Sequence, residues 1–186
     1  MISSNDFKNG VTIELDGTLY TIVEFLHVKP GKGAAFVRTK LKNLKSGNVL
    51  ERTFKAGEKV PRAHITKKIM QYLYPAGDDE FVFMDNESFE QIHIPKETMG
   101  DALKWLKDGA EMEIMLHEET VIGVEPPSHM ELVVTHCEPG FKGDTAQGGS
   151  KPATLETGAT INVPLFVEQG EKILVDTRTS EYLRRI

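Results

Sequence analysis

The 186-residue sequence contains a single cysteine, Cys137, and no long apolar segment. One cysteine excludes an intramolecular disulfide and any zinc site built from several cysteines. No uninterrupted apolar run is longer than four residues, which excludes a transmembrane helix, and the opening residues MISSNDFKNG lack the apolar core of a signal peptide. The sequence therefore predicts a soluble, cytoplasmic protein with no membrane partner.

The motifs of common enzyme classes are also missing. There is no G-x-x-x-x-G-K-[ST] phosphate-binding loop, no G-x-G-x-x-G dinucleotide motif and no G-x-S-x-G nucleophile elbow. No two of the six histidines are four residues apart, the spacing at which they would share a helix face. We predict no catalytic residue, no metal site and no cofactor, although residues far apart in the sequence could still converge in an enzyme.

Charge is distributed unevenly along the chain, whose net charge is −6. Residues 1–63 carry eleven basic and six acidic side chains, a net +5. Residues 64–127 carry five basic and fourteen acidic side chains, a net −9, and residues 128–186 carry six and eight, a net −2. A basic end on an acidic protein favours a polyanionic partner for that end, and a solvated charged face is the alternative.

The basic residues concentrate in one alternating stretch, residues 36–42. A strand there would point every second side chain inward: Val37, Thr39 and Leu41. The outer face would then carry one aromatic ring and three cations: Phe36, Arg38, Lys40 and Lys42. We predict that Arg38, Lys40 and Lys42 bind RNA phosphates, a contact that carries no base specificity.

Short alternating segments separated by turn residues predict an all-β fold of barrels or sandwiches. We expect strands over residues 11–15, 19–28, 34–41, 49–54, 68–74, 81–85, 89–94, 111–117, 120–125, 130–136, 160–166 and 172–176. Only residues 96–108 show helical spacing, with a single apolar stripe of Met99, Ala102, Leu103 and Leu106. Gly109 would end this helix.

Two breaks divide the chain into three segments. Pro126 and Pro127 cannot donate ladder hydrogen bonds, so a sheet should stop there. The other break, near residue 63, is marked by the change in charge. The sequence predicts domains over residues 1–63, 64–127 and 128–186, each near the lower size limit for a self-sufficient core.

Two loops have the composition of functional segments. Lys29-Pro30-Gly31-Lys32-Gly33 joins two alternating stretches, so Lys32 would project from a hairpin tip between two residues without side chains. Such a lysine could reach into a narrow polyanionic cleft, although a solubilising turn lysine is the common alternative. Residues 140–151 form a long loop with four glycines, and an OB-fold uses such loops to hold nucleic acid.

Four segments resemble the bacterial elongation factor P family. They are HVKPGKGAAFVR at residues 27–38, EPGFKGDT at 138–145, KPATLETG at 151–158 and VPLF at 163–166. The block KPATLETG–VPLF resembles the family's C-terminal signature and is highly specific. The resemblance extends in order from Ser4 to the ending Glu181-Tyr182-Leu183-Arg184-Arg185.

The resemblance implies three β-barrels in an L-shaped arrangement: an N-terminal SH3-like or KOW-like barrel, followed by two OB-fold barrels. It also implies a monomer that binds both ribosomal subunits between the P and E sites. There the factor relieves stalling at consecutive prolines by positioning the P-site tRNA, without covalent catalysis.

The resemblance implies a role for several named residues. Lys32 would contact the P-site tRNA and be extended by a modifying enzyme, with Lys29, Pro30, Gly31 and Gly33 forming its hairpin tip. A lysine at this position excludes the arginine-rhamnosylated branch. Gly143, Asp144 and Thr145 would lie near E-site mRNA. Tyr182 and Arg185 are further RNA-binding residues on the same resemblance.

Three other interpretations stay open at this point. The elongation factor P-like paralogue resembles the chain overall but is expected to lack the Gly143-Asp144-Thr145 loop. A general single-strand RNA-binding OB protein should display arrays of exposed aromatics, yet only 8% of the residues are aromatic. An enzyme with dispersed site residues is the third.

Overall fold

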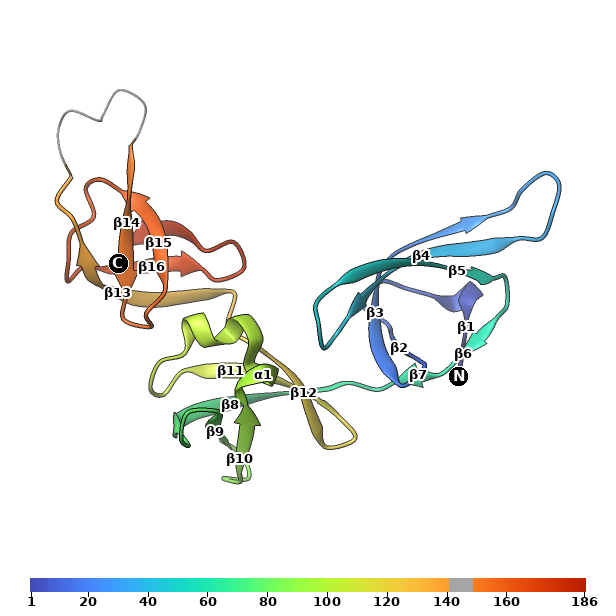
Figure 1. Cartoon of the computed structure of the whole chain (residues 1–186), viewed down its shortest axis with the longest axis horizontal. Helices are drawn as coiled ribbons and strands as arrows, with labels where there is room; N and C mark the ends of the chain where they lie inside the picture. The colour runs from blue at the N-terminus through green and yellow to red at the C-terminus, as the bar shows by residue number, and fades with distance from the viewer. Residues whose placement is uncertain (141–148) are drawn as a thin grey trace. The chain divides into compact units, whose positions relative to one another are not determined.

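The computed structural model describes residues 1–140 and 149–186, and the predicted all-β fold is confirmed (Figure 1). Three barrel-like five-stranded sheets and one two-stranded sheet contain the strands of this part of the chain. The chain divides into two compact units, one of residues 1–67 and 115–123, the other of residues 68–114 and 124–186. Within the described ranges, no helix is long and apolar enough to cross a membrane.

The N-terminal sheet has the strand order β5-β4-β3-β2-β7. Its strands are β2 (Thr12–Leu15), β3 (Thr18–Val28), β4 (Phe36–Asn43), β5 (Val49–Lys55) and β7 (Arg62–Ala63). The short strands β1 (Ile2–Ser3) and β6 (Lys59–Val60) pair with each other, with the 3₁₀ helix η1 (Ser4–Asp6) following β1. Strand residues fill one core together with Phe7, which follows η1; the strand residues are Ile13, Leu15, Ile22, Val37, Leu41, Phe54 and Val60.

The middle sheet has the strand order β10-β9-β8-β11-β12. Its strands are β8 (Thr66–Pro75), β9 (Glu80–Asp85), β10 (Gln91–Pro95), β11 (Glu111–His117) and β12 (Thr120–Glu125). The strand expected from residue 89 begins at Gln91 instead, because Phe89 lies in the preceding turn with a φ of 60°. A left-handed backbone cannot continue a strand.

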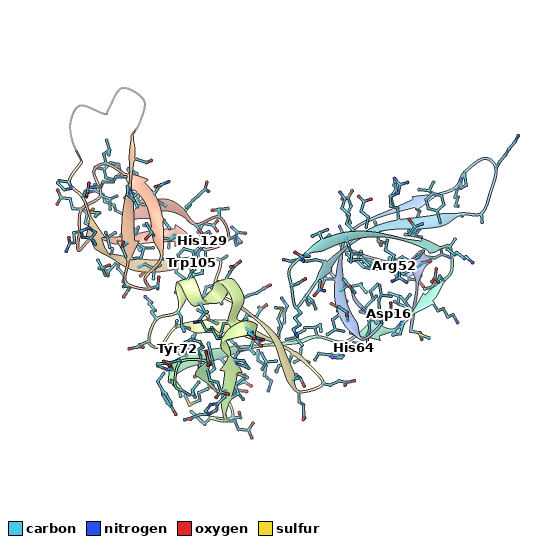
Figure 2. All side chains as sticks on the ribbon, viewed as in Figure 1. Asp16, Arg52, His64, Tyr72, Trp105 and His129 are labelled. Atoms are coloured by element: carbon cyan, nitrogen blue, oxygen red, sulfur yellow. The ribbon has the colours of Figure 1, made fainter. Side chains whose placement is uncertain are left out.

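The helix predicted over residues 96–108 is wrong in type and length. A four-residue α-helix, α1 (Lys96–Met99), leads into a 3₁₀ helix, η2 (Gly100–Trp105). Gly100, with a φ of 52°, interrupts the α-helix after one turn. The buried residues are Met99 at the end of α1 and, in η2, Ala102 and Trp105, which share one face because a 3₁₀ helix has three residues per turn (Trp105 is labelled in Figure 2).

The C-terminal sheet has the strand order β15-β14-β13-β16-β17. Its strands are β13 (His129–Cys137), β14 (Ser150–Leu155), β15 (Thr160–Pro164), β16 (Lys172–Asp176) and β17 (Glu181–Arg185). The sequence patterns missed β14, which contains Pro152, a residue that disfavours a central strand. The proline is tolerated because β13 pairs only with Ala153, Thr154 and Leu155, so Pro152 lies beyond that pairing.

The Pro126–Pro127 break separates β12 from β13, which lie in different sheets. The break is anchored to the C-terminal sheet by Thr177, which is buried. Its hydroxyl donates to the Pro127 carbonyl, and its backbone N–H donates to the Ser128 carbonyl at 3.0 Å. Since the prolines have no N–H groups, the linker is held through its carbonyl oxygens.

Asp176, at the end of β16, makes the stability of the fold depend on pH. The side chain of Arg178 donates to both carboxylate oxygens, at 3.2 Å from Nε and 2.9 Å from Nη2. These hydrogen bonds lower the pKa of Asp176 from 3.8 to about 2. The folded state therefore favours the ionised carboxylate. Its stabilising effect is complete above pH 3.8, the ordinary pKa, and is lost as the pH falls through about 2, the pKa in the folded state.

We predict that Asp176→Asn lowers the melting temperature at neutral pH and that the difference from the unsubstituted protein shrinks at acid pH. Thermal melts followed by circular dichroism from neutral pH to about pH 2 measure this difference. Asp101→Asn, a substitution of an exposed carboxylate in η2, is the control and should change little at any pH. A difference for Asp176→Asn that stays constant over the whole range would contradict the assigned role of its charge.

Candidate nucleic-acid interface

The β3–β4 hairpin presents the first group of predicted site residues. Pairing between the two strands continues to Val28 and Phe36, and β5 accompanies β4 as far as Lys55, opposite Phe36. Residues 29–35 then form a loop that extends past the last paired residues of the sheet (Figure 1). The sequence prediction of a hairpin with Lys32 in its connecting loop is confirmed.

Lys32 is exposed and has no hydrogen bond or ion pair with any residue in the described ranges. Gly33 has a φ of 116°, a conformation that side chains rarely adopt, so the reversal of the chain requires glycine there. Gly31 has no such requirement, and a Cβ atom built on it would meet nothing within 4 Å. A larger side chain at position 31 would therefore meet no neighbouring atom, whereas position 33 requires glycine.

The alternation predicted along β4 is confirmed. Val37, Thr39 and Leu41 are buried, and the Thr39 hydroxyl satisfies its hydrogen bond by donating to the Arg52 carbonyl at 2.7 Å. The side chains of the opposite face are exposed cations, Arg38, Lys40 and Lys42, together with the half-buried ring of Phe36. We call Arg38, Lys40 and Lys42 the basic stripe.

The three cations of the basic stripe are not equivalent, which the sequence pattern alone did not show. Lys40 forms an ion pair of 2.6 Å with Glu24, its register partner on β3, and faces Glu51 on β5. The hydrogen bond to Glu24 raises the pKa of Lys40 above its ordinary value. Arg38 and Lys42 have no ion-pair partner among the described residues, so they carry the uncompensated charge of the stripe.

A second group of site residues lies on the C-terminal sheet. Tyr182, on β17, meets the ring of Phe166 edge to face at a centroid distance of 6.3 Å. The guanidinium of Arg185 lies 4.9 Å from the centroid of the same ring and also pairs with Glu171 at 3.2 Å. Phe166 is 57% exposed although its ring is the centre of this cluster. We call Phe166, Tyr182 and Arg185 the aromatic cluster.

A surface hollow adjoins the aromatic cluster. Its lining combines the two rings with polar residues and with four that have no polar side chain: Ser150, Asn162, Thr179, Ser180 and Glu181, and Gly149, Val163, Pro164 and Leu165. An aromatic wall beside hydroxyl and amide groups suits an unstacked nucleobase, which needs one stacking surface and a few hydrogen bonds. Sequence analysis missed Phe166 as a site residue, although an aromatic two residues after the strand that ends at Pro164 was a possible signal.

The remaining predicted residues, Gly143, Asp144 and Thr145, lie outside the described residues. Lys29 and Pro30 flank Lys32 in the hairpin loop, Lys29 exposed and Pro30 half-buried. The basic stripe and the hairpin belong to one compact unit, and the aromatic cluster belongs to the other.

One arrangement of side chains superficially resembles a catalytic triad. The Ser128 hydroxyl lies 3.0 Å from His129 Nδ1, and His129 Nε2 lies 3.9 Å from Asp176. The second distance is too long for a hydrogen bond, and Asp176 is already occupied by Arg178. The histidine is therefore not oriented by the carboxylate, as a general base of this type requires.

Comparison with known proteins gives consistent matches along the whole chain. Three family models match consecutive segments: "Elongation factor P (EF-P) KOW-like domain" over residues 3–60, "Elongation factor P (EF-P) OB domain" over residues 65–124, and "Elongation factor P, C-terminal" over residues 130–185. Together they account for nearly the entire sequence.

Curated relatives and solved structures agree with these family models. Elongation factor P of Desulfitobacterium hafniense (strain DSM 10664 / DCB-2) is 59% identical over 185 residues, and that of Agathobacter rectalis is 60% identical over 186 residues, each match covering 100% of both chains. A eukaryotic translation initiation factor 5A from Methanococcus jannaschii shares the fold, with a TM-score of 0.53, 23% identity and coverage of 68% of this chain and 90% of that one. The chain thus belongs to the elongation factor P family and is a translation elongation factor.

Proposed function

We propose that this elongation factor binds the ribosome between the P and E sites and positions the P-site tRNA for peptide-bond formation. Proline is a constrained secondary amine that reacts slowly, so help with orientation has its largest effect where consecutive prolines are joined. The observation that carries the proposal is Lys32, an exposed and unpaired amine in a loop that extends beyond its sheet. Such a group can enter a narrow cleft lined by RNA and contact the acceptor end of the tRNA.

Lys32 would act through orientation and electrostatics and not as an enzymatic nucleophile. A charged amine beside developing charge or phosphate stabilises one arrangement of the reactants without forming a bond. We therefore propose a role in the cytoplasm as a non-enzymatic factor. Because Lys32 is exposed, its amine would also be accessible to a modifying enzyme.

The other predicted residues would fix the factor on RNA. The basic stripe offers the two uncompensated cations, Arg38 and Lys42, to phosphates. The aromatic cluster offers a stacking surface, and Gly143-Asp144-Thr145 is proposed to contact E-site mRNA. Positioning by several separate RNA contacts would hold Lys32 in one place relative to the tRNA.

We also propose three domains, with boundaries near residues 63 and 127. The proposal is supported by the three five-stranded sheets and by the three family models, which match consecutive segments. Limited proteolysis followed by mass spectrometry tests it, and cleavage confined to places other than the two boundaries would count against it.

We predict that Lys32→Ala removes most of the stimulation of proline–proline bond formation while the fold survives. The side chain makes no described contact, so the free energy of unfolding should change by about 0.5 kcal/mol or less. The measurement is product formation on a proline-repeat message in reconstituted translation, with circular dichroism on the same samples. Lys45→Ala, which removes the same charge from another exposed turn of this sheet, is the matched control. Full activity of a folded Lys32→Ala protein would refute the proposed role of the amine.

The basic stripe gives a prediction that distinguishes its members. Arg38→Ala and Lys42→Ala should each weaken ribosome binding and reduce the slope of log affinity against log salt by about one. Lys40→Ala should reduce the slope less, because its charge is already matched by Glu24. Co-sedimentation with ribosomes over a range of salt concentrations measures all three slopes. An equal effect of the three substitutions would show that the Glu24 ion pair is irrelevant in the complex.

Truncation of the aromatic cluster should weaken ribosome binding without unfolding the C-terminal sheet. Loss of a base stacked on an aromatic ring weakens binding by about 1–3 kcal/mol, so we expect Phe166→Ala to reduce affinity at least fivefold. Ile186→Ala, which shortens another half-exposed apolar side chain of this unit, should leave affinity unchanged. Identical affinities of the two variants, both with native melting temperatures, would argue against a stacking role for Phe166.

A further inference from the structure

Phe89 combines two unfavourable features that the fold itself does not explain. Its side chain is 72% exposed, and its backbone has a φ of 60°. A bulky residue is strained in this left-handed region, which glycine or asparagine adopts more easily. A retained strain of this kind is a reason to look for a function at the position.

Phe89 is unusual among the non-glycine residues that have a positive φ. Four other non-glycine residues of the described ranges have a positive φ, and all are polar: Asp16, Glu118, Glu119 and Ser180. Tyr74, on β8 of the same sheet, is another half-exposed aromatic, but it lies in a strand and pairs with Val82 of β9, next to a shift of register. Phe89 is thus the one apolar side chain in this part of the chain that a left-handed turn presents to solvent.

The turn that carries Phe89 is held by a set of hydrogen bonds around Asp85. The backbone N–H of Phe89 donates to the Asp85 carbonyl at 2.8 Å, and the Asp85 N–H donates to the Glu90 carbonyl at 3.0 Å. The Asp85 carboxylate accepts from the Glu87 N–H at 2.9 Å. The backbone that presents the ring is therefore set by the fold before any partner binds, which lowers the entropy lost on association.

The surroundings of Phe89 are acidic. Glu87 and Glu90 are exposed on either side of it. The nearby Asn86 side chain donates a hydrogen bond of 3.2 Å to the carboxylate of the exposed Glu111. The charge of Lys68, which lies near this turn, is matched by an ion pair with Asp85 at 3.3 Å. An apolar ring inside an acidic rim repels phosphate backbones and complements a basic surface.

We propose that Phe89, with the acidic rim of Glu87, Glu90 and Glu111, docks on a basic protein surface that has an apolar pocket for the ring. The inference rests on the proposed function, because the ribosome is where the partner would be met. It assigns this turn to a basic ribosomal protein, in contrast to the RNA contacts proposed for the hairpin and the aromatic cluster. A few buried aromatic anchors commonly provide most of the energy of such an interface.

The identity of the partner is tested by photocrosslinking. Phe89 is replaced by the photoreactive residue p-benzoylphenylalanine, the full chain is bound to intact ribosomes and illuminated, and the crosslinked product is digested separately with ribonuclease and protease. We expect a ribonuclease-resistant product that contains a basic ribosomal protein. A crosslink to RNA, or no crosslink while the protein is bound, would overturn the proposal. The same replacement at Tyr74 is the control and should not give this product.

The energetic contribution of the ring is tested with Phe89→Gly. This variant keeps the left-handed turn and removes its strain, so we expect an equal or higher melting temperature together with ribosome binding about tenfold weaker. Tyr74→Ala should leave binding unchanged, and Glu87→Gln with Glu90→Gln should slow association. Unchanged binding of Phe89→Gly would refute the inference alone, because Lys32-dependent stimulation could still be intact. Failure of the unsubstituted chain to bind ribosomes would instead refute the proposed function and this inference with it.

Discussion

The period-two alternation of β4 is the constraint on which the N-terminal sheet and its charged surface both depend. Burying Val37, Thr39 and Leu41 in one core forces Arg38, Lys40 and Lys42 to the opposite face. A shift of register by one residue would bury the cations, which is strongly unfavourable without partners. The same pairing with β3 brings the chain to the loop that carries Lys32. Packing of the core and presentation of the basic stripe are therefore two results of one register.

The surfaces of the chain differ in the chemistry they offer. The N-terminal sheet presents uncompensated cations, the C-terminal sheet presents two aromatic rings, packed edge to face, beside polar groups, and the turn around Phe89 presents an apolar ring among carboxylates. Phosphates, unstacked bases and basic proteins are the respective complements of these surfaces. A factor that must be positioned within an assembly of RNA and protein gains accuracy from contacts of different kinds, because each excludes partners that another would tolerate.

Backbone geometry decided several features that side-chain patterns described incorrectly. The spacing of Met99, Ala102, Leu103 and Leu106 fits an α-helix, yet Gly100 turns the chain into a 3₁₀ helix, and Trp105 takes the buried position. β14 escaped detection because Pro152 argues against a central strand, and only the short pairing with β13 shows why it is allowed. Phe89 was assigned to a strand because of its side chain, while its φ places it in a turn.

The sequence by itself determined the all-β class, the Lys32 hairpin and the alternation along β4, because strand period, glycine and proline act locally. Its motifs also identified the family that the comparisons then confirmed. The tertiary structure alone decided which charges are compensated, because the ion pair of Lys40 with Glu24 joins residues on different strands. It alone brought Phe166, Tyr182 and Arg185 together in one cluster beside a hollow, because their contacts connect segments that are separate in the sequence. Local patterns encode the direction in which a side chain points, whereas its partners depend on the register between strands.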